Sequence, residues 1–143
     1  MAKGLKVDFG PVPLLIEGSN ESTVIELEAL AASLSKRVYV VNEEQRQWIH
    51  VAAVFANNFT NHLWALSEKL LTDHGLDFEI LRPLIERSVE NLQHLSPTDA
   101  QTGPAARQDY QVINKHLDML GDSARMKEIY TILTDSIIAS SRK

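Results

Sequence analysis

The first forty residues contain two short apolar runs separated by a stretch with helical spacing. Residues 12–17 form a short apolar run, and residues 37–41 are β-branched and aromatic, so each segment predicts a strand. The residues able to cap the intervening helix are Ser19, Asn20, Ser22 and, in a capping box with Glu26, Thr23. A strand, a helix and a strand within about thirty residues predict a parallel βαβ unit. Since two strands alone make a poor sheet, we expect this unit to be the edge of a larger one.

The remainder of the chain shows helical patterns only. Residues 43–73 contain neither glycine nor proline and predict one helix of about eight turns, which Gly75 ends. Asp77 is expected to cap the next helix, which runs to about residue 95 with a kink or a late start at Pro83.

Two further helices are predicted after a turn-rich loop over residues 96–107. The first begins near Pro104 or Gln108 and ends at Gly121, and Asp122 is expected to cap the second. The predicted fold is therefore mainly α. It consists of a strand–helix–strand segment over residues 1–42 and a helical domain over residues 43–143.

Composition narrows the class of protein. The 143 residues include 14 Lys and Arg, 19 Asp and Glu, and no cysteine. A net charge of −5 argues against nucleic acid as a partner, and the lack of cysteine excludes disulfides and cysteine nucleophiles. No apolar run approaches the roughly 20 residues of a membrane helix, and the N-terminal residues lack the apolar core of a signal peptide. We therefore expect a cytoplasmic protein that has no membrane partner.

Familiar catalytic and cofactor motifs are missing from the sequence. The five histidines form no i, i+4 pair and no H-E-x-x-H, so no metal site is expected. There is no G-x-S-x-G, no G-x-G-x-x-G and no phosphate-binding loop, so we expect this chain alone to bind no nucleotide. His116 shares an apolar helix face with Ile113 and Leu120 and is expected to be a hydrogen-bonded core residue.

The long predicted helix carries a polar stripe. At about 100° per residue, the members of a stripe about 80° wide are Arg46, His50, Val54, Asn57, Asn61 and Glu68. Asn58 and His62 fall just beside this stripe, and the opposite side is apolar, with Trp48, Phe55 and Phe59 among its residues. Three asparagines in five residues are unusual in mid-helix, because asparagine competes with the backbone for hydrogen bonds. The stripe is either an amide-rich solvated face or the lining of a cleft that orients a polar ligand.

The segment Thr102–Asp109 is a second candidate site. Gly103 and Pro104 can start a helix, whose free backbone N–H groups would form an anion site together with Thr102 and Arg107. The alternative is an ordinary helix start with Arg107 in water.

Several segments together resemble a bacterial family of unknown function. They are His50–Phe59, Leu81–Ile85, Asn91-Leu92, Thr102–Asp109 and His116-Leu117, and the string T-G-P-x-x-R-x-D is the most specific of them. Members of that family carry a Rossmann-type NAD(P) domain followed by a helical domain of unknown function. They are described as NADP oxidoreductases and are similar to pyrroline-5-carboxylate reductase and ketopantoate reductase. The helical part resembles the C-terminal domain of 6-phosphogluconate dehydrogenase.

The resemblance implies roles for individual residues of the long helix. Enzymes like ketopantoate reductase place a lysine there, with asparagines four and eight residues later. Aligned through Trp48, those positions are His50, Val54 and Asn58, of which Asn58 alone matches. His50 replaces the lysine, and an imidazole can donate a proton or a hydrogen bond, so His50 is the candidate proton donor.

The resemblance implies that residues 1–42 are the last strand–helix–strand of a Rossmann domain and that the chain is a C-terminal fragment of an NAD- or NADP-dependent oxidoreductase. The missing N-terminal domain would bind the cofactor. This chain would supply substrate binding and a homodimer interface. The candidate residues for a small anionic substrate are Asn58, Asn61, Thr102 and Arg107, with His50 in a catalytic role. The alternative is a non-enzymatic helical module whose polar stripe binds a protein partner.

Overall fold

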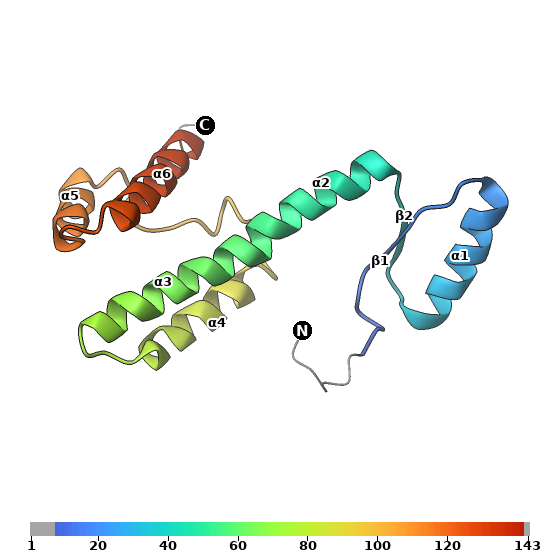
Figure 1. Cartoon of the computed structure of the whole chain (residues 1–143), viewed down its shortest axis with the longest axis horizontal. Helices are drawn as coiled ribbons and strands as arrows, with labels where there is room; N and C mark the ends of the chain where they lie inside the picture. Colours follow the sequence, from blue (N-terminus) through green and yellow to red (C-terminus); the bar gives the residue numbers. More distant parts are fainter. Residues whose placement is uncertain (1–7, 142–143) are drawn as a thin grey trace. The chain divides into compact units, whose positions relative to one another are not determined.

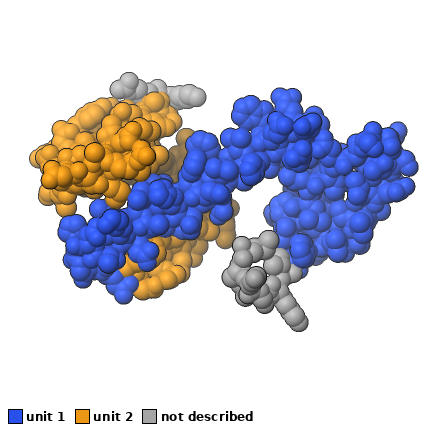
Figure 2. All heavy atoms as spheres, in the orientation of Figure 1, with its two compact units in different colours: residues 1–77 blue, residues 78–143 orange. Residues whose placement is uncertain are grey.

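The structure is a computed structural model in which residues 8–141 are described. The chain divides into two compact units, residues 1–77 and residues 78–143, coloured blue and orange in Figure 2. The boundary between the two units lies just after the end of the long helix that is predicted over residues 43–73. The boundary predicted from the sequence, between residues 42 and 43, has a different meaning, because residues 1–42 are expected to belong to a preceding Rossmann-type domain. That boundary stays a prediction.

The first unit begins with the predicted βαβ segment. Strand β1 (Leu14–Ile16) and strand β2 (Val38–Val40) pair in parallel, with Leu14 opposite Val38 and Ile16 opposite Val40. Helix α1 (Glu21–Leu34) connects them and packs against both (Figure 1). The strands are three residues each, shorter than the apolar runs that predicted them.

Helix α1 begins at a cap that differs from the predicted capping box. The side chain of Asn20 accepts a hydrogen bond from the Thr23 amide at 2.9 Å, so Asn20 is the N-cap and Thr23 lies in the first turn. The box of Thr23 with Glu26 is wrong, because the helix starts two residues before Thr23. Ala31 is the buried residue of α1, whereas its Leu30 and Leu34 are exposed.

A buried serine fixes the turn between α1 and β2. The Ser35 hydroxyl donates to the carbonyl of Val12, just before β1, and accepts a hydrogen bond from the Arg37 amide at 3.0 Å. Ser35 is 4% exposed. One side chain thus joins the segments that enter both strands, which helps to set the parallel register.

Replacing Ser35 by alanine should destabilise the βαβ segment. The Ser35→Ala variant leaves the Val12 carbonyl and the Arg37 amide without this partner, at a cost of about 1–3 kcal/mol. Ser33→Ala is the matched control, because the Ser33 hydroxyl bonds within α1, to Leu30, and is exposed. Urea unfolding followed by circular dichroism measures both. Equal effects of the two substitutions would contradict the role given to Ser35.

The predicted long helix is confirmed over residues 43–73, with one interruption. It consists of α2 (Glu43–Ala53), a π-helical segment η1 (Val54–Phe59) and α3 (Thr60–Asp73). Gly75 ends it as predicted, with φ at 72°, a conformation that glycine adopts without strain.

The second unit contains the other helices. A short 3₁₀ turn, η2 (Phe78–Leu81), leads into α4 (Arg82–Asn91), which confirms the late start at Pro83 and ends four residues before the predicted limit. A hydrogen bond from Arg82 lowers the pKa of the Glu79 carboxyl at this junction, and both side chains are exposed.

Helices α5 (Tyr110–Met119) and α6 (Ala124–Ser140) follow the loop. The buried cluster of this unit contains Ala105, Ile113 and Ile138. Ser123 rather than the predicted Asp122 occupies the N-cap position of α6. Within the described residues, none of the helices is long and apolar enough to cross a membrane.

Candidate functional site

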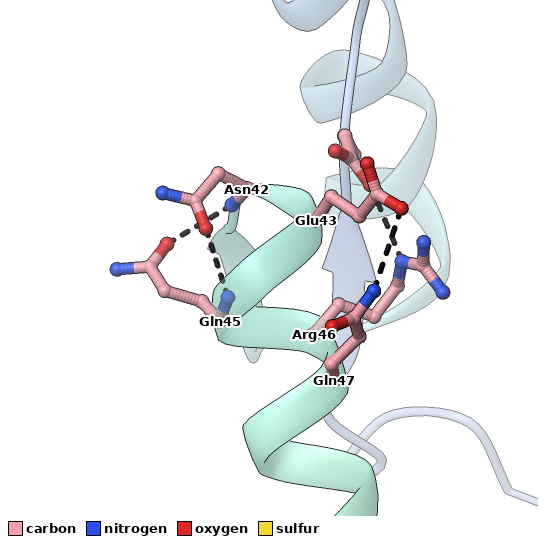
Figure 3. Close-up of polar contacts among 6 residues, drawn as sticks. Asn42, Glu43, Gln45, Arg46 and Gln47 are labelled. Atoms are coloured by element: carbon pink, nitrogen blue, oxygen red, sulfur yellow. Dashed lines mark hydrogen bonds and ion pairs between the residues drawn. The ribbon is translucent and has the colours of Figure 1, made fainter.

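The start of the long helix is fixed by several polar contacts (Figure 3). Asn42 caps it in a reciprocal box with Gln45, with hydrogen bonds of 2.8 and 2.9 Å. Arg46 forms an ion pair of 3.2 Å with Glu17, the residue that follows β1. Such a surface pair contributes little free energy, but it ties the helix to the carboxyl end of the sheet.

The π segment lies in the middle of the polar stripe. The Thr60 hydroxyl donates to the carbonyl of Phe55, five residues earlier, at 3.3 Å. In regular helix farther along, the hydroxyls of Ser67 and Ser88 donate to carbonyls four residues earlier. The shift from four to five residues follows the wider winding of η1. Segments of this kind are rare and occur often at functional sites.

The π segment changes which residues share a face. It inserts one residue into the helix, so everything after it is rotated by about 100° relative to a regular α-helix. From Asn57 onward, each member of the predicted stripe is therefore replaced by the residue that follows it. The polar residues that continue from Arg46 and His50 are Asn58, His62 and Lys69, in place of Asn57, Asn61 and Glu68. We call the face of Arg46, His50, Asn58, His62 and Lys69 the aligned face.

This rotation corrects the straight stripe that the sequence predicts, because that stripe assumed regular winding throughout. His50, Asn58 and Asn61 are all exposed. Asn58 accepts a weak hydrogen bond of 3.5 Å from Asn57. Within residues 8–141 the side chains of His50 and His62 make no hydrogen bond. Whether His50, Asn58 and Asn61 serve a substrate stays a prediction.

The loop before α5 differs from its prediction. Residues 104–108 form hydrogen-bonded turns, and the helix begins at Tyr110, close to the alternative start at Gln108. The carboxylate of Asp109 caps the helix by accepting from Val112 at 3.2 Å. A helix start at Pro104 is therefore wrong. The anion site was expected at the N-terminus of that helix, and this argument for it no longer holds, because Asp109 places a negative charge at the actual helix start. Thr102 and Arg107 are exposed residues of the second unit.

His116 is the hydrogen-bonded, partly buried residue that the sequence predicts. Its Nδ1 lies 2.9 Å from the hydroxyl of Tyr130, and the two rings meet edge to face. Tyr130 also packs against the buried cluster of the second unit. A structural role for this pair accounts for its contacts.

The second unit contains a surface pocket that no sequence pattern indicated. It has a volume of about 500 Å³ and lies between the loop before α5 and the end of α6. Its polar lining comes from Thr98, Gln101, Ser136, Ser140 and Ser141. The hydroxyls of Ser140 and Ser141 already donate to carbonyls of α6, so these two are left as acceptors for a ligand. Among the described residues, no group of three His, Asp or Glu side chains is placed to hold a metal ion.

The fold by itself defines a class of protein: a parallel βαβ segment followed by a mainly helical part. Residues 12–137 match the family described as Domain of unknown function (DUF2520). The chain belongs to this family, which confirms the resemblance to proteins with a helical domain of unknown function.

Two solved structures are similar to this chain. One is the Bacteroides fragilis protein named "putative NADP oxidoreductase BF3122", with 43% sequence identity and a TM-score of 0.89 over 96% of this chain. The other is protein TM1727 from Thermotoga maritima, with 24% identity and a TM-score of 0.75 over 89% of this chain, which supports the fold alone. The chain spans about half of each, 53% and 52% of their lengths. No curated protein of similar sequence is found.

Proposed function

We propose that this chain is the substrate-binding and dimerisation part of an NADP- or NAD-dependent oxidoreductase. The observation that carries the proposal is the match to BF3122, which is named as an NADP oxidoreductase and is about twice as long as the matched region. Residues 1–42 would complete the sheet of a preceding Rossmann-type domain, and residues 43–143 would form the substrate side of the cleft. The cytoplasmic location belongs to the same proposal.

The residues of this chain do not themselves fit a dinucleotide. The turn from β1 into α1 contains the single glycine Gly18 rather than the three that let a backbone approach a pyrophosphate. A Cβ at Gly18 would lie 2.8 Å from the Val24 side chain, so this glycine lets the turn pack closely against the first turn of α1. We therefore assign cofactor binding to a preceding domain, where the nicotinamide would supply the hydride chemistry.

Within this proposal the roles of the side chains follow from their chemistry. His50 donates a proton to the substrate, because an imidazole serves as a general acid in many enzymes. Asn58 and Asn61 orient neutral oxygens through amide donors. Thr102 and Arg107 bind the anionic part of a small substrate, since a guanidinium pairs with carboxylate in two parallel hydrogen bonds.

The test of the proposal begins in the coding sequence upstream of residue 1. A G-x-G-x-x-G after a predicted strand supports the oxidoreductase, and its absence favours an interaction module. The extended protein should then oxidise NADPH in the presence of small oxo or imino acids, followed by absorbance. Failure across such a panel, with NADPH binding also absent, would reject the proposal.

A further inference from the structure

The surface pocket of the second unit lies between two walls that internal contacts hold in place. One wall is the turn over residues 97–100, where the amide of Ala100 donates to the carbonyl of Ser96 at 3.0 Å. The other wall is the last part of α6, whose Ile137 packs against the buried cluster of this unit. The pocket is therefore built on the core of the second unit. Its volume of about 500 Å³ lies in the usual range for small-molecule sites.

The pocket gathers neutral polar groups from both walls. Ser136 and Ser140 are four residues apart, so they share one face of α6, and Thr98 lines the pocket from the turn. Within the described residues, the hydroxyls of Thr98 and Ser136 make no hydrogen bond, so each is free to donate. The side-chain oxygen of Gln101 is left as an acceptor, because its amide nitrogen already donates to the Thr102 carbonyl at 2.9 Å. The pocket thus offers both donors and acceptors.

The charge of the lining selects the class of ligand. Among the described residues, no charged side chain lines the pocket. The carboxylate of Asp99, in the same turn, lies outside the lining and accepts from the Ser96 hydroxyl at 2.6 Å. A neutral lining cannot compensate the desolvation of an ion, so it disfavours one. Pro97 and Ile137 add apolar surface to the hydroxyls, a combination that matches a compound with several hydroxyl groups and an apolar C–H face.

We propose that this pocket binds a neutral polyhydroxyl compound of about monosaccharide size. The hydroxyls of Thr98 and Ser136 donate to oxygens of the ligand. Ser140 and Gln101 accept from its hydroxyl groups, and its C–H face packs on Ile137. The polar lining residues are exposed, so water competes for them and the affinity is in the millimolar range. None of the lining residues is assigned to the cofactor or to the anionic substrate, and the site therefore goes beyond the proposed function.

The binding test titrates D-glucose into the 143-residue chain and follows backbone amide signals by NMR. The signals of Gln101 and Ser140 should shift along one saturable curve. Thr98→Val and Ser136→Ala each remove one donor with little change of shape and should each weaken binding about fivefold, the loss expected for one neutral hydrogen bond. Thr131→Val is the matched control and should leave binding unchanged, because Thr131 is an exposed residue of α6 outside the lining.

A blocking variant and a charged analogue complete the test. Ser140→Trp places an indole across the pocket from an exposed helix position, so it should abolish the glucose shifts while the circular dichroism spectrum is kept. Glucose 6-phosphate should bind no more tightly than glucose. No saturable shift up to about 100 mM glucose, undiminished binding by Ser140→Trp, or clearly tighter binding of the phosphate would each overturn the proposal. No step uses NADPH, so the outcome is separate from that of the proposed function.

Discussion

Light scattering of this chain at micromolar concentration should give about twice the 16.0 kDa mass of one copy. The physical reason is uncovered apolar surface. Large apolar side chains of the long helix lie exposed, among them Trp48, Ile49, Val51, Phe55 and Phe59. Covering them with a second copy would remove this apolar area from water, which is the main driving force for association.

The long helix carries the residues that we expect in that interface. Trp48 is 67% exposed, Phe55 66% and Phe59 50%, although aromatic side chains of this size are normally covered. Phe55 and Phe59 already contact each other edge to face, with ring centroids 5.0 Å apart. A second copy that packs on this surface would cover all three, which is why the homodimer belongs to the proposed function.

One substitution should separate the copies. Phe55→Asp places a carboxylate in the interface and removes a large apolar contact, so association should weaken by about a hundredfold or more. Asn57→Asp is the matched control, because it adds the same charge two residues away at a polar position. A monomer before any substitution would contradict the dimer. If the Phe55→Asp variant forms a dimer as tight as that of the control, the interface lies elsewhere on the surface.

The elements that the sequence predicts well depend on local chemistry. The apolar runs that predict β1 and β2, the uninterrupted pattern over residues 43–73, the stop at Gly75 and the late start at Pro83 all arise from backbone preferences of neighbouring residues. The parallel pairing of the strands followed from the helix between them.

The errors lie where competing local choices are close in energy. Asn20 and Thr23 can each cap α1, and Asp109 competes with Pro104 for the start of α5; hydrogen bonding by Asn20 and Asp109 decides both cases. The role of Ser35 could not be predicted from local patterns, because its partner, the Val12 carbonyl, is 23 residues away.

The π segment had the largest consequence for the site. Helical patterns are recognised by assuming a fixed rotation per residue. One inserted residue therefore leaves the helix recognisable in the sequence but rotates its second half relative to the first. The Thr60 hydroxyl and the run of asparagines before it were the available signals, since both types of side chain compete for backbone hydrogen bonds.

NADPH should not bind measurably to the 143-residue chain, and the same chain with its upstream region should bind it. Fluorescence titration of the short chain should show no saturation below about 1 mM, and the extended protein should bind near 1 μM, a difference of about a thousandfold. The reason is the turn from β1 into α1. Its one glycine, Gly18, packs against Val24, so the turn lacks the three-glycine loop that lets a backbone approach a pyrophosphate.

The control for this experiment is the extended protein with the first glycine of its upstream G-x-G-x-x-G replaced by alanine, which should lose NADPH while keeping its helical content. Tight binding of NADPH by the short chain would contradict the assignment of the cofactor to a preceding domain. An extended protein that binds no NADPH would contradict the oxidoreductase, and the exposed face of the long helix would then favour a protein partner.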